Sequence, residues 1–231
     1  MTSVVAIILA RGGSKGLPKK NIRLLNGRPL ISYTIQDAKK SKKIDRVIVS
    51  TDDNEIAHVA KQEGAEVPFL RPPHLSDDEA TSEVALRHTI EWLSKNESYN
   101  PEIIVYLQAT EPLRPKNIID DCIDILLKEK NIDTVFAALE TYKNYWRIND
   151  NKQAQRLAND MTYGIRRQVR EPIFREDTGI ALAVRRSIIL DGKRVGNNCR
   201  IIPYTHPGSL IDIHDEFDLA LAEFIINKIK K

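Results

Sequence analysis

Short apolar segments alternate with amphipathic segments from the N-terminus to Glu140, and this alternation restricts the possible folds more than any other feature of the sequence. The apolar segments have the length of buried strands, and the segments between them carry apolar residues at helical spacing. Such an alternation predicts an α/β fold, in which a mostly parallel sheet is covered by helices on both faces in three layers. We expect strands at 4–10, 46–50, 66–70, 102–107 and 134–139, and helices at 29–40, from Asp52 or Asp53 to Gly64, at 81–94, from Pro115, and at 215–229.

The length of 231 residues fits a single domain spanning 1–231. The regular pattern stops between residues 140 and 177, a polar stretch that contains Tyr145, Trp146 and a cluster of arginines, and it returns at 178–184. We interpret 140–177 as an insertion lobe within the domain. Two aromatic residues in a polar stretch would suit a dimer interface, and irregular packing on the same chain explains them equally well.

The composition excludes several classes of protein. Lys and Arg number 35 against 32 Asp and Glu, and hydrophobic residues make up 42% of the chain. These values are typical of a globular domain, so we expect neither a disordered chain nor a nucleic-acid partner. The two cysteines, Cys122 and Cys199, form no metal or disulfide pattern and fit a reduced, cytoplasmic setting. The apolar run at 4–10 is too short to span a membrane, so no membrane partner is expected.

A segment rich in glycine and cations, LARGGSKGLPKKN at residues 9–21, follows the first predicted strand. Gly12, Gly13 and Gly16 allow the backbone to approach a ligand and to adopt positive φ. Backbone amides combined with fixed cations are what an oligophosphate requires. The segment is neither a Rossmann fingerprint, which needs glycine where Arg11 stands, nor a Walker loop, because no G-K-[ST] follows at the required offset. Its cations are Arg11, Lys15, Lys19 and Lys20.

This segment, together with GRPLISYTI after it, resembles the cytidylyltransferases of 3-deoxy-2-keto sugar acids, the CMP-N-acylneuraminate synthetase family. The later segments VIVSTDDNEIAHVAKQEGAEVPFLRP, LSDDEATSEV, VYLQATEPLR, RRQ…FREDTG and IDIHDEFDLALAE are similar to that family in the same order. The resemblance covers most of the chain. It implies the Rossmann-type fold of nucleotide-diphospho-sugar transferases, CTP and a keto sugar acid as substrates, Mg²⁺ as cofactor, and a homodimer.

The resemblance also implies a reaction, in which the anomeric hydroxyl of the sugar acid attacks the α-phosphate of CTP to give a CMP-sugar and pyrophosphate. Positioning and charge neutralisation would carry most of the catalysis, with Arg11 and Lys20 acting on the phosphates. A solvated surface position explains Lys15 and Lys19 equally well, and a helix cap explains Ser82 equally well. The implied nucleotide contacts are Leu9, Ala10, Arg11, Gly12, Gly13, Ser14, Lys20, Asn21, Arg71, Ala80 and Ser82.

The sugar side is implied to include Gln108, which follows a predicted strand. The carboxylate of a sugar acid suits an arginine fork, and the matched segment offers Arg167 with Gln168 beside it, and Arg175 as a second choice. Ordinary salt bridges explain at least two of the arginines in that segment. Glu111 departs from the small hydroxyl residue usual in the family motif, and its role is left open.

Asp212 matches the first of two family aspartates that hold Mg²⁺, an ion that prefers carboxylate oxygens, and we expect it to be catalytic. The second aspartate is replaced by His214. Asp215 could substitute if the chain turns there, and it could equally be the N-cap of the last helix.

Three functions follow as hypotheses. The first is a cytidylyltransferase for a sialic-acid-like nonulosonate. The second is a sugar-1-phosphate nucleotidyltransferase, which shares the glycine-rich loop, but Arg167 and Asp212 argue against it. The third is a nucleotide-binding homologue without catalysis, which the histidine at position 214 favours. The stretch TYKNYWRI differs from the usual sialic-acid version, so the acceptor sugar stays open.

Overall fold

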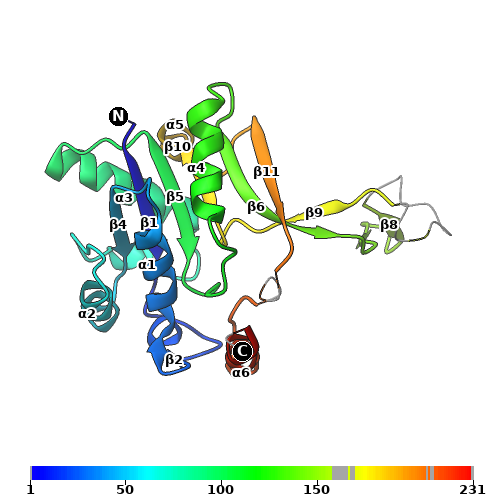
Figure 1. The fold of residues 1–231 in the computed structure, drawn as a ribbon, viewed down its shortest axis with the longest axis horizontal. Coiled ribbons are helices and arrows are strands. Elements are labelled where there is room, and N and C mark those ends of the chain that lie inside the picture. The colour runs from blue at the N-terminus through cyan, green and yellow to red at the C-terminus, as the bar shows by residue number, and fades with distance from the viewer. Residues whose placement is uncertain (1, 158–165, 167–169, 207, 209–210, 230–231) are drawn as a thin grey trace.

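The computed structural model describes residues 2–157, 166, 170–206, 208 and 211–229 (Figure 1). Its centre is one seven-stranded sheet in the order β11–β6–β10–β5–β1–β4, with β9 pairing to the outer half of β6. The pairs β1–β4, β1–β5 and β6–β11 are parallel, whereas β9 and β10 run antiparallel to their neighbours. The strands are β1 (Val4–Leu9), β4 (Arg46–Ser50), β5 (Ile103–Gln108), β6 (Thr134–Thr141), β9 (Ile173–Glu176), β10 (Leu182–Arg185) and β11 (Cys199–Tyr204).

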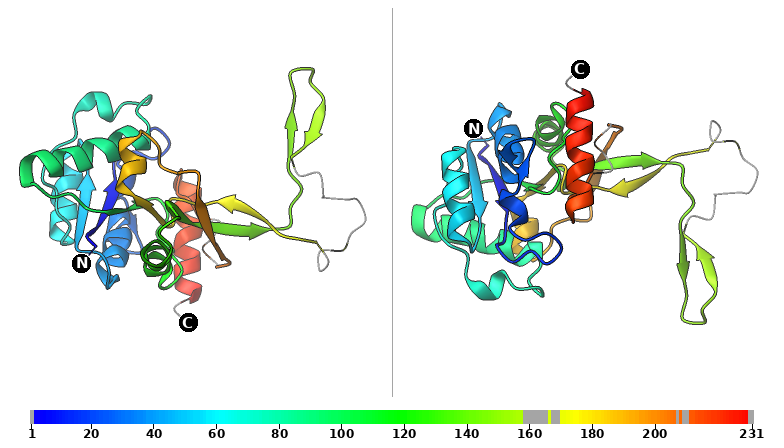
Figure 2. Two further views of the ribbon diagram at one scale, coloured as in Figure 1. Left: turned by 90° about the horizontal axis from the view of Figure 1, so that it is seen from above. Right: turned by 90° about the horizontal axis from the view of Figure 1, so that it is seen from below.

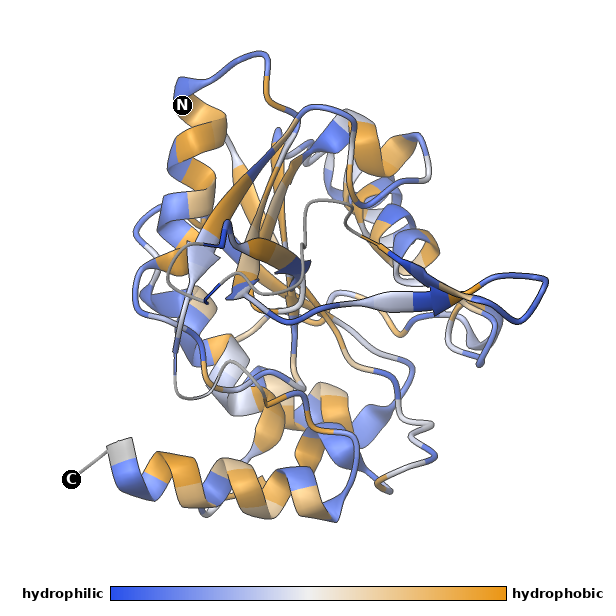
Figure 3. Cartoon of the chain, turned by 90° about the vertical axis from the view of Figure 1, so that its right-hand side faces the viewer, coloured by the Kyte–Doolittle hydropathy of each residue, from blue (hydrophilic) through white to orange (hydrophobic). Residues whose placement is uncertain are grey.

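Helices cover both faces of this sheet, which confirms the predicted three-layer α/β fold. Successive side chains of a strand point to opposite faces, so Val4, Ala6 and Ile8 of β1 pack under one layer and Val5 and Ile7 under the other. The apolar colour of the strands in Figure 3 follows this burial. One layer holds α1 (Leu30–Lys40), α2 (Asn54–Gln62) and α4 (Ile118–Lys128), and the other holds α3 (Ser82–Glu97) and α5 (Arg186–Leu190).

The last helix, α6 (Glu216–Ile229), lies below the sheet in Figure 1 and has a separate small core. There Leu219 and Ile226 pack with Leu17 of the glycine-rich segment and with Ile213. The C-terminal part of the chain is thereby fixed beside the loop after β1. The remaining short elements near this core are η1 (Lys20–Ile22), β2 (Leu24–Leu25) and β3 (Arg28–Pro29), and η2 (Pro73–Leu75) lies further along the chain.

Two sequence predictions were wrong in detail. The predicted strand 66–70 is only an isolated bridge between Glu66 and Ile48, because Pro68 cannot donate to a ladder. The helix predicted from Pro115 begins at Ile118, since Asn117 before it has a φ of 66°. The regular pattern that returns at 178–184 leads into β10, which begins at Leu182 and runs antiparallel to both of its neighbours.

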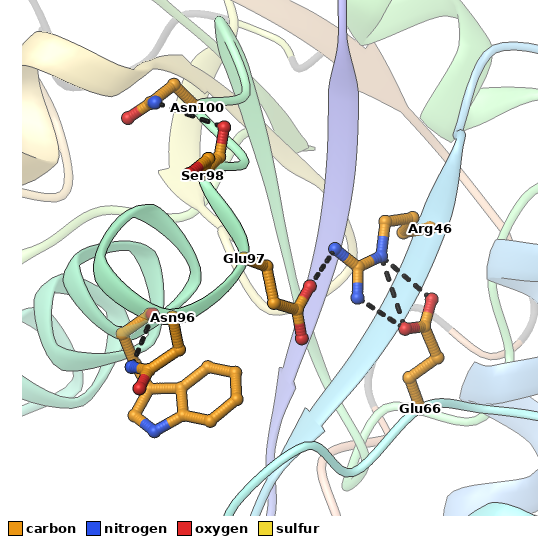
Figure 4. Close-up of polar contacts among 7 residues, drawn as sticks. Arg46, Glu66, Asn96, Glu97, Ser98 and Asn100 are labelled. Atoms are coloured by element: carbon orange, nitrogen blue, oxygen red, sulfur yellow. Dashed lines mark hydrogen bonds and ion pairs between the residues drawn. The ribbon is translucent and has the colours of Figure 1, made fainter.

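Arg46 joins the segment after α2 to the end of α3 at the β4 edge of the sheet (Figure 4). Its guanidinium pairs with Glu66 at 2.5 Å and with Glu97 at the end of α3 at 2.6 Å. The hydrogen bonds to Glu66 are the main cause that raises the pKa of Arg46. This edge therefore carries a network of charges rather than an open ladder, which protects an edge strand from pairing with another chain.

The lobe predicted at 140–177 forms an arm. Strands β6 and β9 leave the body together, and the hairpin β7 (Trp146–Ile148) with β8 (Ala154–Arg156) stands at their outer end (Figure 2). Trp146, Ile148 and Leu157 are 48%, 76% and 58% exposed. The arm thus presents large apolar side chains to solvent.

Within the described part of the chain, every helix is too short or too polar to cross a membrane.

Candidate active site

A cavity of about 420 Å³ opens at the edge of the sheet where β1 and β5 end. Ligands bind at this edge in α/β folds, and the volume is within the range of small-molecule sites. Gly13 and Ser14 line a smaller hollow that shares Arg11 with the cavity, and Ala10 is buried beneath both. Of the residues predicted from sequence, the cavity is lined by Leu9, Arg11, Lys20, Asn21, Arg71, Ala80, Ser82, Gln108 and Asp212.

The glycine-rich loop is held by close contacts with the protein itself. Gly12 donates its amide to Asp52 Oδ1 at 3.0 Å, and a Cβ on Gly12 would lie 2.7 Å from Asp53 Oδ2. A Cβ on Gly16 would lie 2.6 Å from the carbonyl oxygen of His214. Gly12 and Gly16 have ordinary negative φ, and the left-handed residue of this loop is Lys19, at 53°. The expectation that the loop glycines use positive φ was therefore wrong: these two serve close packing.

Two cations of the loop, Arg11 and Lys20, line the cavity. The Arg11 guanidinium donates to the carbonyl oxygen of Asp77 at 2.8 Å and pairs with Asp78 at 3.1 Å. The Lys20 ammonium donates to the Ile213 carbonyl oxygen at 2.8 Å. Burial lowers the pKa of Lys20, and the nearby Asp212 carboxylate opposes that change. The cavity therefore combines two positive charges with an acidic loop that partly neutralises them.

The other two lysines differ from this pair. Lys15 is exposed and pairs with Asp78 at 2.5 Å, while Lys19 is exposed and pairs with Glu55 at 2.6 Å, away from the cavity. A surface position thus accounts for both, as the alternative in the sequence analysis held. Asn21 lines the cavity, and its side-chain amide also donates to the carbonyl oxygen of Arg11 at 2.9 Å. This hydrogen bond connects the two ends of the glycine-rich loop.

Arg71 is buried on the far wall and is fixed from two sides. Its Nε donates to Ser76 at 2.8 Å, and its guanidinium lies 4.0 Å from Asp52 Oδ1. Because Asp52 also accepts from the glycine-rich loop, one carboxylate connects the two walls. Asp53 instead caps α2, accepting from the amides of Glu55 and Ile56, which settles the choice between the two aspartates.

Tyr106 is a site residue that sequence reasoning missed. It is 2% exposed and its hydroxyl lies 3.4 Å from Ser82 Oγ and 3.0 Å from Gln108 Nε2. The N-cap of α3 is Thr81, so the capping alternative for Ser82 was wrong. Tyr106 precedes Gln108 by two residues in a strand, so both point to the same face, and this spacing was the available signal.

Arg114 fixes the backbone behind Gln108. Its guanidinium donates to the carbonyl oxygens of Gln108, Gly179 and Ile180 at 2.5, 3.0 and 2.8 Å, and to the Thr34 hydroxyl at 2.8 Å. These bonds join the end of β5 to the approach to β10 and to α1. The arginine of the PLR motif thus stabilises the position of Gln108 without lining the cavity.

Asp212 enters the cavity from the segment before α6. Its Oδ2 pairs with His214 Nε2 at 3.0 Å, and its buried Oδ1 has no hydrogen-bond partner among the described residues. Asp215 Oδ1 accepts from the Asp218 amide at 3.0 Å, as an N-cap of α6 does, and Asp215 does not line the cavity. Residues 2–157, 166, 170–206, 208 and 211–229 contain no group of three or more His, Cys, Asp or Glu that could hold a metal.

The predicted sugar contacts on the arm are placed less fully. Arg167 and Gln168 lie outside the described residues. Arg175, on β9, pairs with Asp177 Oδ2 at 3.1 Å and does not line the cavity. Asp177 also accepts from the Tyr204 hydroxyl, and both residues are 7% exposed.

The same fold occurs in two solved structures. A CMP:2-keto-3-deoxy-manno-octonic acid synthetase complexed with CTP has a TM-score of 0.72 at 14% identity, covering 99% of this chain and 100% of that one. A 4-diphosphocytidyl-2C-methyl-D-erythritol synthase from Anaerococcus prevotii has a TM-score of 0.68 at 13% identity, covering 98% and 99%. At these identities the likenesses show the fold alone, an α/β fold with a mostly parallel central sheet.

The family follows from sequence. The family model described as Cytidylyltransferase matches residues 5–195, and this chain belongs to that family. The Pseudaminic acid cytidylyltransferase of Campylobacter jejuni strain 81-176 is 40% identical over 153 residues, which cover 64% of this chain and 65%, just under two thirds, of that protein. The CMP-N,N'-diacetyllegionaminic acid synthase of Legionella pneumophila is 32% identical over 95% of this chain and 94% of that protein. The predicted family resemblance is confirmed.

Proposed function

We propose that this protein is a cytidylyltransferase that couples CTP to a nonulosonic acid, giving a CMP-sugar and pyrophosphate. The observation that carries the proposal is the meeting of Arg11, Lys20, Gln108 and Asp212 in one cavity at the strand ends. The names of the relatives, which refer to pseudaminic and diacetyllegionaminic acids, support an acidic nine-carbon sugar as acceptor.

The proposed chemistry demands little covalent work from the protein. As the anomeric oxygen attacks the α-phosphate, negative charge builds on the phosphate oxygens and on the departing pyrophosphate, and fixed cations stabilise that charge. Lys20 supplies a half-buried point charge held by the Ile213 carbonyl, and Arg11 supplies a planar fork held by the carbonyl of Asp77. In this proposal the triphosphate takes the place that Asp78 now occupies beside Arg11.

Of the two aspartates predicted to hold Mg²⁺, Asp212 fits the ion better than Asp215. Asp212 would hold it, because its buried Oδ1 lacks a partner among the described residues and a carboxylate with phosphate oxygens is a usual Mg²⁺ environment. The ion would supply charge neutralisation at the phosphates. Asp215 is a weaker candidate, since its carboxylate caps α6.

The arm supports the proposal of a homodimer. Trp146, Ile148 and Leu157 expose apolar area that a second copy of this chain would cover. The arm would then bring Arg175 of β9 towards the sugar side of the site.

A single assay tests the function. Purified protein is incubated with CTP, Mg²⁺ and either nonulosonic acids, an eight-carbon keto sugar acid or sugar-1-phosphates, and pyrophosphate release is measured. Release with a nonulosonic acid is the expected result. Release only with a sugar-1-phosphate would indicate a sugar-1-phosphate nucleotidyltransferase instead. CTP binding without any pyrophosphate release would indicate a non-catalytic homologue.

A further inference from the structure

Arg194 is a partly buried cation that the proposed chemistry does not use. It lies in the loop after α5, its side chain is 24% exposed, and it does not line the cavity. Its guanidinium carbon stands over the ring of Tyr106, 5.6 Å from the ring centroid. At this distance a guanidinium is attracted by the negative face of an aromatic ring. Arg194 therefore contacts a residue of the cavity wall without being part of that wall.

Two carboxylates flank the guanidinium of Arg194, and it pairs closely with neither. Its Nε lies 3.8 Å from Glu83 Oε1, and its Nη2 lies 3.5 Å from Glu176 Oε1. Charge-assisted hydrogen bonds usually measure about 2.7–2.9 Å, and Arg46 reaches its two glutamates at 2.5 and 2.6 Å. The Nε of Arg194 is buried and has no hydrogen-bond partner among the described residues. The guanidinium is thus placed over the Tyr106 ring and shared between the two carboxylates.

The loop that carries Arg194 is fixed on both sides of it. Before it, the Lys193 amide donates to the carbonyl oxygen of Ile188 in α5 at 3.1 Å. After it, the amides of the two residues that follow Gly196 donate to Asp133 Oδ2 at 3.2 and 3.0 Å. A Cβ on Gly196 would overlap the Asp133 carboxylate, so the loop packs closely against the residue before β6. The backbone therefore holds the Arg194 side chain in a defined place.

The hydroxyl of Tyr106 extends this arrangement into the cavity. It lies 3.4 Å from Ser82 Oγ and accepts from Gln108 Nε2 at 3.0 Å. Glu83, which pairs with Arg194, directly follows Ser82 in the first turn of α3. Arg194 therefore contacts both the ring and the end of the helix that meets the hydroxyl of that ring.

We propose that Arg194 is a positioning residue: by holding the Tyr106 ring and the start of α3 together, it fixes the hydroxyl of that tyrosine in the cavity. The hydroxyl in turn restricts the Ser82 hydroxyl and the Gln108 amide. Glu176, the last residue of β9, connects the same guanidinium to the base of the arm. The inference rests on the proposed function for the identity of the ligand that this wall meets.

A double-mutant cycle tests whether Arg194 acts through the Tyr106 hydroxyl. Arg194→Gln removes the cation and should lower kcat/KM for pyrophosphate release about fivefold, the size expected for a partly buried cation–π contact. Tyr106→Phe keeps the ring and removes the hydroxyl, so Arg194→Gln should lower kcat/KM by less than about twofold in that background. A merely structural role would give the same loss in both backgrounds, and that result would overturn the proposal.

The side-chain amide NMR signals of Gln108, assigned by their absence in Gln108→Leu, give a second readout that needs no turnover. These signals should move in Arg194→Gln, because the hydroxyl that accepts from the amide is no longer held in place. The same change made in Tyr106→Phe should leave them where Tyr106→Phe alone puts them. Gln108 signals that do not move in Arg194→Gln would overturn the positioning role.

Arg87→Gln is the matched control, because Arg87 forms an exposed ion pair with Glu91 on α3 and its loss should change neither readout. If Arg194→Gln does not fold, Arg194→Met, which has a long side chain without the charge, replaces it. A wild-type protein that releases no pyrophosphate would overturn the proposed function instead. The Gln108 signals would then still decide whether Arg194 positions this wall.

Discussion

The edge of the sheet around the cavity and the arm that extends from the C-terminal end of β6 are built in contrasting ways. At the cavity, Arg71, Asn21 and Tyr106 are buried and each is fixed by partners from the same chain. On the arm, Trp146 and Ile148 are large and exposed. The cavity is therefore organised before any ligand arrives, which favours electrostatic catalysis, whereas the arm has apolar area that another surface would stabilise. The predictions below test this contrast.

The largest effect is expected at the cavity, from Lys20→Gln compared with Lys19→Gln. Both changes remove one cation from neighbouring positions, but only Lys20 lines the cavity, and Lys19 forms an exposed ion pair with Glu55. Loss of Lys20 should lower kcat by about a hundredfold or more through lost charge stabilisation. Loss of Lys19 should leave it within about twofold, because exposed ion pairs contribute little. Pyrophosphate release measures kcat for both variants. Equal losses of kcat would show that a lysine lining the cavity contributes no more to catalysis than an exposed one.

The next effect concerns pH and the interior behind the cavity. Glu111 is 6% exposed, and burial, followed by the nearby Asp177 carboxyl, raises its pKa from 4.5 in an unfolded chain to about 9 in the folded protein. Between these values the folded state binds more protons, so its contribution to stability is complete below the lower value and is lost as pH rises towards the higher one, at up to about 1.4 kcal/mol per pH unit.

Glu111→Gln removes this dependence. The free energy of unfolding is measured in urea at several pH values within that window. The value for the variant should therefore increase relative to the value for wild type as pH rises. Parallel curves for the two proteins would show that Glu111 has an ordinary pKa.

A smaller effect, on stability, is expected to distinguish alanine substitutions at two glycines of the same loop. In Gly16→Ala, the added Cβ would press on the carbonyl oxygen of His214, which belongs to the backbone and cannot turn aside. We expect a loss of about 1–3 kcal/mol in stability. Gly13→Ala meets nothing within 4 Å and should leave the melting temperature unchanged. Calorimetry measures both variants, and equal melting temperatures would contradict the packing of the loop against residues 212–214.

The smallest effect on the folded chain is expected on the arm. Trp146→Ser combined with Ile148→Ser removes exposed apolar side chains, so the melting temperature of the monomer should scarcely change. The proposed dimer should dissociate at concentrations where wild type remains associated, as analytical ultracentrifugation would show. Lys95→Gln, a change of an exposed residue on α3, is the control. Dimers that persist would direct attention to another surface.

The parts of the fold with regular local patterns could be predicted from the sequence. Strand β4 has the expected bounds, and α1 lies within the expected range, since apolar spacing within each segment suffices to indicate them. Strand β11 was missed because Arg200 and Pro203 interrupt its apolar pattern, and an edge strand tolerates both. The direction of β10 depends on its neighbours in the sheet, which no local pattern reveals.

The site follows the same division. The glycine-rich loop and Gln108 could be placed because the loop comes at the end of β1 and Gln108 is the last residue of β5, and the ends of these parallel strands meet at one edge. Tyr106 and the partners of Glu111 could not, because Asp177 and Tyr204 come from distant segments that only the folded sheet brings together. The role of Asp215 could not be predicted either, because its local sequence suits both a metal ligand and a helix cap. In the structure Asp215 caps α6.

The hydroxyl of Tyr106 has a consequence for redesign of substrate choice. The Tyr106 hydroxyl oxygen lies 3.4 Å from Ser82 Oγ and 3.0 Å from Gln108 Nε2. The residue implied to contact the nucleoside and the residue implied to contact the acceptor therefore share one neighbouring atom. Under the proposed function, a substitution at Gln108 that admits a new sugar would also remove a hydrogen-bond partner of Tyr106 and alter the contacts with the base-bearing half of CTP. Acceptor range and nucleotide affinity in this protein would therefore change together, and variants selected for one should be screened for the other.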